Sequence, residues 1–179
     1  MYKPIAIATG VVMALGAAGA GAATAAKLTD PQIAHIVVTA DDLDIANAKL
    51  ALDKSKNAEV QRFAHRMIAD HGSVTDQAVA LAKKLNITPE DNPTSKSLKD
   101  AQDASRKRLD SLSGVAFDKA YANNEAAYHK IVDDALSNTL IPDAQNAELK
   151  SLLESGLKIF QDHLRDAESI AKQLNAAPG

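Results

Sequence analysis

Between Val60 and Leu85, apolar side chains recur at steps of three and four residues, and this spacing constrains the fold more than any other feature of the chain. Side chains at those steps lie on one face of an α-helix, so the segment predicts an amphipathic helix that turns this face toward a core. One member of the stripe is a histidine, and the full set is Val60, Ala64, Met67, His71, Val74, Ala78, Leu81 and Leu85.

Three further segments carry apolar stripes of the same period, and none alternates as a strand would. Only 3% of the residues are aromatic, and the many alanine, leucine and charged residues favour helices. We therefore expect an all-α fold, an antiparallel four-helix bundle with an additional charged helical segment between helices 2 and 3. That segment is Thr94 to Leu112. The first three main helices are expected from Asp30 to about Lys54, from Asn57 to about Asn86 and from Gly114 to about Leu136. A turn is expected at Asn138 to Pro142, and the fourth helix follows it and ends at about Leu174.

The first 25 residues have the pattern of a signal peptide. Lys3 supplies a positive charge, Ile5 to Ala23 is apolar, and Ala23-Thr24-Ala25 provides the small residues of a cleavage site. We expect a single domain over residues 26–179, exported to the periplasm or outer envelope, with no transmembrane helix once the leader is removed. An uncleaved membrane anchor is the alternative, but the apolar run thins out into glycine and alanine.

Composition excludes several kinds of site. The chain has no cysteine, which excludes disulfides, lipoprotein attachment, iron–sulfur clusters and thiolate zinc sites. The net charge is −3 with both signs spread along the chain, so there is no dense basic stripe of the kind that binds nucleic acid. Neither a phosphate-binding glycine motif nor a hydrolase signature is present.

Each main predicted helix carries an ionisable group inside its apolar stripe. Asp44 lies in the first stripe, His71 in the second and His163 in the fourth, while Glu125 and His129 lie one turn apart in the third. These positions fall near the middle of their helices, so antiparallel packing is expected to bring them into one layer. A buried carboxylate without partners costs several kcal/mol. Either a metal ion or mutual Asp–His and Glu–His hydrogen bonds would remove that cost, and the sequence leaves both open.

Other residues near these stripes receive lesser roles. We expect His65, on the flank of the second helix, and His35, opposite the first stripe, to lie at the surface. Asp70, at the edge of the second stripe, is expected to support the site from outside. Val115 is expected within the stripe of the third helix.

Four short motifs stand in a characteristic order along the chain. Phe63 to His71 reads Phe-Ala-x-x-Met-x-x-Asp-His, and Gly114 to Tyr121 reads Gly-x-x-Phe-Asp-x-x-Tyr, with His129 eight residues later. Leu50-Ala51-Leu52 lies near the end of the first helix, and His163-Leu164 with Ala167 gives a final His-Leu-x-x-Ala. From about residue 30 to about residue 174, the chain thereby resembles domain-of-unknown-function family 4142, a bacterial envelope family often labelled "predicted outer membrane protein".

This resemblance implies a ferritin-like four-helix bundle, exported to the periplasm or outer envelope, and it implies no particular activity. His71, His129 and His163 match the family pattern, whereas Asp44 stands where the pattern carries glutamate. The shorter carboxylate keeps its capacity to bind a metal but has less reach.

The chain departs from the wider ferritin-like superfamily at two positions. That superfamily binds two irons through glutamates and two Glu-x-x-His motifs. Here Ile68 and Phe160 stand three residues before His71 and His163, so both expected glutamates are missing. The remaining three histidines and two carboxylates suit a single zinc, iron, copper or manganese ion better than a di-iron centre.

Three functions remain. The first is a binding protein for one transition metal in envelope metal handling or stress protection, with Asp44, His71, Glu125, His129 and His163 as ligands. The second is a metal-free structural or interaction protein of the envelope, with a buried polar network and a protein partner. The third is a metalloenzyme that uses oxygen or peroxide. It requires an open coordination position that no motif indicates, so we expect enzymatic activity least.

Overall fold

The computed structural model describes residues 26–176, and this part of the chain is helical and contains no strand. The all-α class is therefore confirmed, whereas the predicted signal peptide lies outside the described residues. The long helices are α1 (Asp30–Lys54), α2 (Ala58–Leu85), α3 (Pro93–Asp110), α4 (Gly114–Ala135) and α6 (Ala147–Ala176).

Local sequence accounts for where these helices begin. Thr29 caps α1 by accepting a hydrogen bond from the backbone N–H of Gln32, whose side chain accepts one in return from the backbone of Thr29. Asn57 caps α2 by accepting from Glu59 N–H at 2.9 Å. At the other end of α2, Asn86 adopts the left-handed conformation, with φ of 53°, that commonly terminates helices.

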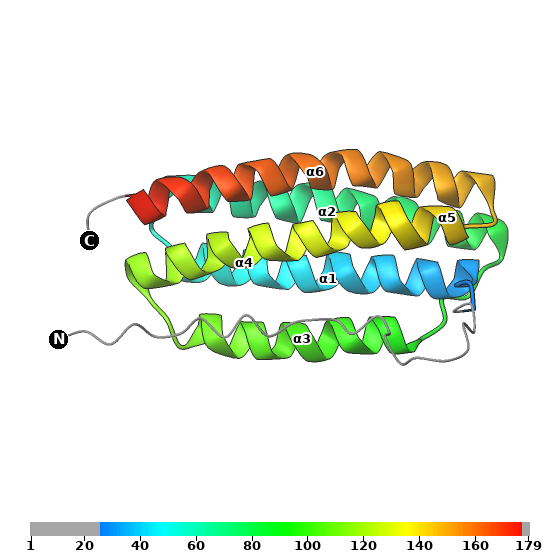
Figure 1. Cartoon of the computed structure of the whole chain (residues 1–179), viewed down its shortest axis with the longest axis horizontal. Coiled ribbons are helices and arrows are strands. Elements are labelled where there is room, and N and C mark those ends of the chain that lie inside the picture. The colour runs from blue at the N-terminus through cyan, green and yellow to red at the C-terminus, as the bar shows by residue number, and fades with distance from the viewer. Residues whose placement is uncertain (1–25, 177–179) are drawn as a thin grey trace, which may run out of the picture.

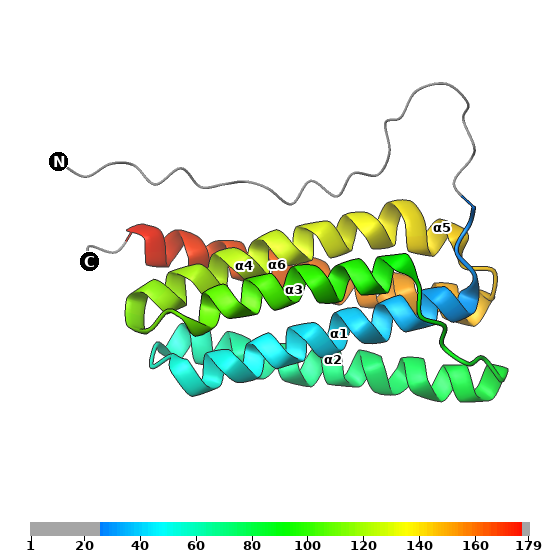
Figure 2. The same cartoon turned by 90° about the horizontal axis from the view of Figure 1, so that it is seen from below.

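The helices α1, α2, α4 and α6 lie side by side along one long axis (Figure 1). Helix α1 packs against α2, α4 packs against α6, and α2 also contacts α6. Helix α3 runs back along the outside and contacts α1 and α4 (Figure 2). Because α3 returns the chain to its starting end, α2 and α4 run in the same direction (Figure 1).

The core consists of two apolar clusters. One contains residues such as Ala48, Met67 and Ala122, and the other contains residues such as Val37 and Val74. On each of α1, α2, α4 and α6, the predicted site residues stand between residues of the first cluster and residues of the second. The bundle therefore has a polar layer with apolar packing on both sides.

The predicted turn at Asn138 to Pro142 is wrong. The helix continues from α4 through a π-helical turn, η1 (Leu136–Leu140), into the short α5 (Ile141–Asp143). Leu136 and Leu140 are buried and hold this segment on the core. Pro142 stands within α5, which ends one residue later at Asp143, so the helix ends after the predicted turn and not before it.

Val115 is also wrongly predicted, because 57% of its surface is exposed. It lies in the first turn of α4, where residues 113–116 are all exposed. The stripe of α4 that faces the core begins at Phe117 instead. Periodicity cannot show that the first turn of a helix is left exposed.

Candidate functional site

The five ionisable residues singled out by helical spacing are all buried in the polar layer. Their exposed fractions are 2% for His71 and 0% for the other four, namely Asp44, Glu125, His129 and His163. Helix α1 supplies the aspartate, α2 and α6 supply one histidine each, and α4 supplies the glutamate and the remaining histidine. The structure therefore brings together every residue of the predicted set.

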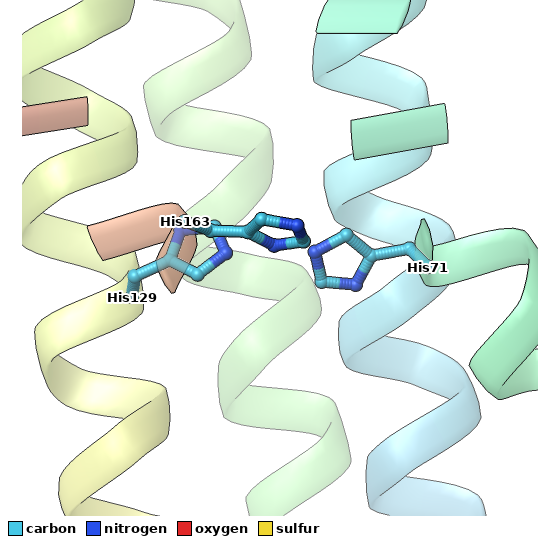
Figure 3. A group of neighbouring side chains, drawn as sticks. All are labelled: His71, His129 and His163. Carbon is cyan, nitrogen blue, oxygen red and sulfur yellow. The ribbon is translucent and has the colours of Figure 1, made fainter. Parts of the chain in front are cut away.

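Two overlapping groups of potential ligands share His129. One consists of His71, His129 and His163, and the other of Asp44, Glu125 and His129. Within each group the ligand atoms lie within 4.8 Å of one another. Asp44 Oδ2 connects the groups, because it lies 3.1 Å from His71 Nε2 and 3.4 Å from His129 Nε2. Figure 3 shows the three imidazole rings converging from three different helices.

Each histidine uses one ring nitrogen to contact an oxygen that is not one of the potential ligand atoms. His71 Nδ1 lies 2.8 Å from Asp41 Oδ1, and His163 Nε2 lies 2.8 Å from Asp70 Oδ2. His129 Nδ1 lies 3.0 Å from the backbone carbonyl oxygen of Glu125. Phe160 stacks on the His71 ring at 4.6 Å between centroids and further restricts its orientation.

These outer contacts determine the character of the inner nitrogens. A carbonyl oxygen or an ionised carboxylate can only accept, so the outer nitrogen of each ring carries the proton. In a neutral ring the inner nitrogen then holds a lone pair. None of the three inner nitrogens has a hydrogen-bond partner among the described residues; they are His71 Nε2, His129 Nε2 and His163 Nδ1. Asp44 Oδ1 and Glu125 Oε2 also lack such a partner, and Asp44 Oδ2 has only its contacts with His71 and His129.

The two buried carboxyl groups have opposite pKa shifts. Burial raises the pKa of Glu125 well above its usual value, and the nearby charge of Asp44 raises it further. For Asp44, burial acts in the same direction, but the charges of His71 and His129 outweigh it and hold the pKa well below the usual value. Without a bound cation, the surroundings therefore favour the ionised form of Asp44 and the protonated form of Glu125.

The histidines also differ from one another. Burial opposes the charge on His71, but Asp44 and Asp41 outweigh it and raise the pKa of His71 to about 10. Burial lowers the pKa of His129 and takes that of His163 to about 4. His71, whose ring lies between two aspartates, is thus the histidine that carries a second proton and a positive charge in the absence of metal.

The chemistry of this cluster suits a transition metal. Imidazole nitrogens and carboxylate oxygens bind zinc, iron, copper and manganese ions, and neutral imidazoles with fixed tautomers are the usual histidine ligands. A tetrahedral ion with bonds of about 2.1 Å would hold its ligand atoms about 3.4 Å apart. Asp44 Oδ2 already lies at about that separation from His71 Nε2 and His129 Nε2.

Asp41 is a contributor that helical spacing did not identify. It is 1% exposed, contacts His71 and accepts a hydrogen bond from Thr75 Oγ1 at 3.2 Å. Asp41 precedes Asp44 by three residues, so both lie on one face of α1. That spacing was the available signal. Asp70 does support the site from outside, as predicted, and its partner is His163.

The other predicted positions hold in part. His65 is exposed on α2, as expected. The side chain of His35 is only 23% exposed and lies 3.7 Å from Asp91, so it is less accessible than expected. Neither belongs to the buried cluster.

Within residues 26–176, no helix combines the length and apolar character needed to cross a bilayer. A family model described as "Domain of unknown function (DUF4142)" matches residues 15–170. Comparison with curated proteins and with solved structures gives no match.

Proposed function

Since the chain belongs to the DUF4142 family, whose description assigns no activity, we propose a function from the buried cluster itself: the protein binds one transition-metal ion. The ligands are Asp44, His71, Glu125, His129 and His163, and the ion is zinc, iron, copper or manganese. The role we propose is metal handling or protection from stress in the cell envelope.

One observation carries this proposal. Three buried ring nitrogens from three helices converge, and each ring is fixed by an oxygen on its far side. Buried polar atoms without hydrogen-bond partners are unfavourable, and a cation bound between them would remove that cost. A metal ion would satisfy these nitrogens together with the unpartnered oxygens of Asp44 and Glu125.

The course of the helices supports a ferritin-like bundle as the setting of this site. Ferritin-like folds have one long crossover connection between their second and third main helices. Helix α3 is suited to that role, because it runs back along the bundle between α2 and α4 (Figure 2). The cluster holds three histidines and two carboxylates, which favours one ion over a carboxylate-bridged pair.

Export remains part of the proposal. Its basis is the charged, apolar and small-residue order of residues 1–25. Mass determination of the protein recovered from cells tests it. A chain that begins near Ala26 supports export, whereas a mature protein that retains residue 1 contradicts cleavage.

The experiment for metal binding is elemental analysis. The protein is purified without a histidine tag or chelator, loaded separately with zinc, iron, copper or manganese, and desalted. We expect about one ion per chain, lost in His71→Ala. His65→Ala is the matched control, because it removes an exposed histidine from the same helix and should retain the ion. Failure of every metal to remain bound would contradict the proposal.

A metal-free buried network is the second candidate, and one observation favours it. His71 lies between Asp41 and Asp44, and its pKa of about 10 gives a stable imidazolium without metal. This pairing leaves the inner nitrogen of His163 without a partner, which is why we rank it second. In this case the protein would act as a structural or interaction protein with a partner in the envelope, and removing His71 would destabilise it equally with and without metal.

A further inference from the structure

A cavity of about 370 Å³ lies beside the polar layer, between α1, α3 and the α4–η1 segment. Its lining is largely apolar and includes Ile36, Val132, Leu136 and Leu140. Helix α3 covers one side through Leu98, and exposed residues of α3 such as Ser97 place its mouth at the surface. The π-helical turn η1 forms part of the wall, and such turns occur frequently at functional sites.

The size of this cavity calls for an occupant. Protein cores are close-packed and contain few voids larger than a water molecule. A volume of 370 Å³ instead falls in the range of small-molecule pockets, and it is too small for a helix of a partner protein. Ordered water would find few partners along walls made mainly of leucine, isoleucine, valine and alanine side chains.

The inner end of the cavity is polar. Asp41 contributes to the lining and is 1% exposed. Its two oxygens accept one contact each, from His71 and Thr75, so the carboxylate has unused acceptor capacity. An N–H or O–H group at this end of the cavity would find a buried acceptor, while the remainder of the molecule would lie against apolar walls.

We propose that this cavity binds a small, mainly apolar molecule that donates one hydrogen bond to Asp41. The inference extends beyond metal binding and does not depend on it, because the cavity exists without an ion. The two sites are neighbours, since Asp41 and Phe160 both line the cavity and contact His71.

The test uses N-phenyl-1-naphthylamine, a neutral aromatic probe with one N–H donor whose fluorescence increases in apolar surroundings. We expect saturable binding at about one probe per chain, both with and without metal. 1-Phenylnaphthalene has a similar shape but no donor. It should displace the probe about tenfold more weakly than non-fluorescent amines of similar size do. Equal displacement would contradict the role assigned to Asp41.

The matched variants fill the cavity or leave it unchanged. Ala40→Leu and Ala135→Leu place extra carbon atoms in the lining, and together they should weaken probe binding at least tenfold. Ala127→Leu makes the same change at an exposed position of α4 and should have no effect. If the combined variant folds poorly, the two single variants provide the same comparison.

The outcomes separate this proposal from the proposed metal site. Probe binding that survives His163→Ala and is lost on cavity filling supports the ligand pocket, whatever the metal analysis shows. The proposal is overturned if the probe fails to saturate or if the filled variants bind as the parent does. Failure of the parent protein to retain any metal, with unchanged probe binding, would count against the metal site alone.

Discussion

His163 and Asp70 lie on different helices and are joined at 2.8 Å between Nε2 and Oδ2, although His163 is fully buried and the side chain of Asp70 is 34% exposed. The contact therefore links the polar layer to the surface of the bundle. Arg66 approaches Asp70 at 3.2 Å and also pairs with Asp166, so the aspartate is itself held in place.

We expect Asp70→Asn to weaken metal binding about 10- to 100-fold. The asparagine retains an acceptor for His163 but removes the charge that fixes the tautomer and raises the basicity of the ring. Competition with a chromophoric chelator measures the change. Asp166→Asn is the control, because it removes the other carboxylate partner of Arg66 and leaves the bond to His163. Equal loss in both variants would assign the effect to Arg66.

Bound metal should raise the melting temperature of the protein, because an ion that binds only the folded state stabilises it by mass action. At a free metal concentration of about 100 times the Kd, the expected gain is about 2.7 kcal/mol. Differential scanning calorimetry with and without the metal measures the shift, and a chelator should reverse it. His163→Ala should fold without metal and lose most of the gain. A gain of the parent's size in that variant would exclude His163 as a ligand.

Asp133 should give the protein a measurable pH dependence. Burial raises its pKa to about 6, and Arg165 only partly opposes this. The folded state therefore binds the proton of Asp133 more tightly than the unfolded chain does. The protonated carboxyl group contributes its full stabilisation of the fold below about pH 4, and this contribution is lost as the pH rises through 6. Asp133→Asn should be more stable than the parent above pH 6, by about 1 kcal/mol after allowance for solvent screening.

Urea denaturation at pH 4 and pH 7.5 tests this expectation for Asp133. The difference between variant and parent should be small at the lower pH and larger at the higher one. Asp134→Asn changes an exposed neighbour and serves as the control. A pH-independent difference would show that another property of the substitution is responsible.

Lys54 should stabilise the junction between α3 and α4. Its ammonium group donates to the backbone carbonyl of Leu112 at 3.0 Å and also contacts the carbonyls of Leu109 and Asp110. Lys54→Met keeps the aliphatic stem and removes these bonds, so the free energy of unfolding should fall by about 1–2 kcal/mol. Lys49→Met, at an exposed position of α1, should change it little. Thermal denaturation of both variants compares them directly.

The sequence was sufficient to predict which side chains meet in the core. Asp44, His71 and His163 interrupt stripes that are otherwise apolar, and a helix buries whatever lies on its apolar face. Helix ends near Lys54 and Asn86 were also predictable, because capping residues follow local rules.

Other features depend on tertiary contacts that periodicity does not contain. Pro142 suggested a turn, but buried Leu136 and Leu140 keep the chain helical through a π turn. Asp41 was missed because its role depends on the position of His71, which comes from another helix. The exposure of Val115 was missed because periodicity does not show that the first turn of α4 is left uncovered.

The course of the chain has a consequence for the order of folding events. The α1–α2 hairpin carries Asp44 and His71, whereas α4 and α6 carry Glu125, His129 and His163. Neither half holds the complete set, so the ligands assemble only when the two halves dock. An ion bound there would slow the separation of the two halves more than it would speed their association. If the chain folds after the export proposed above, the ion would come from the compartment in which the two halves dock.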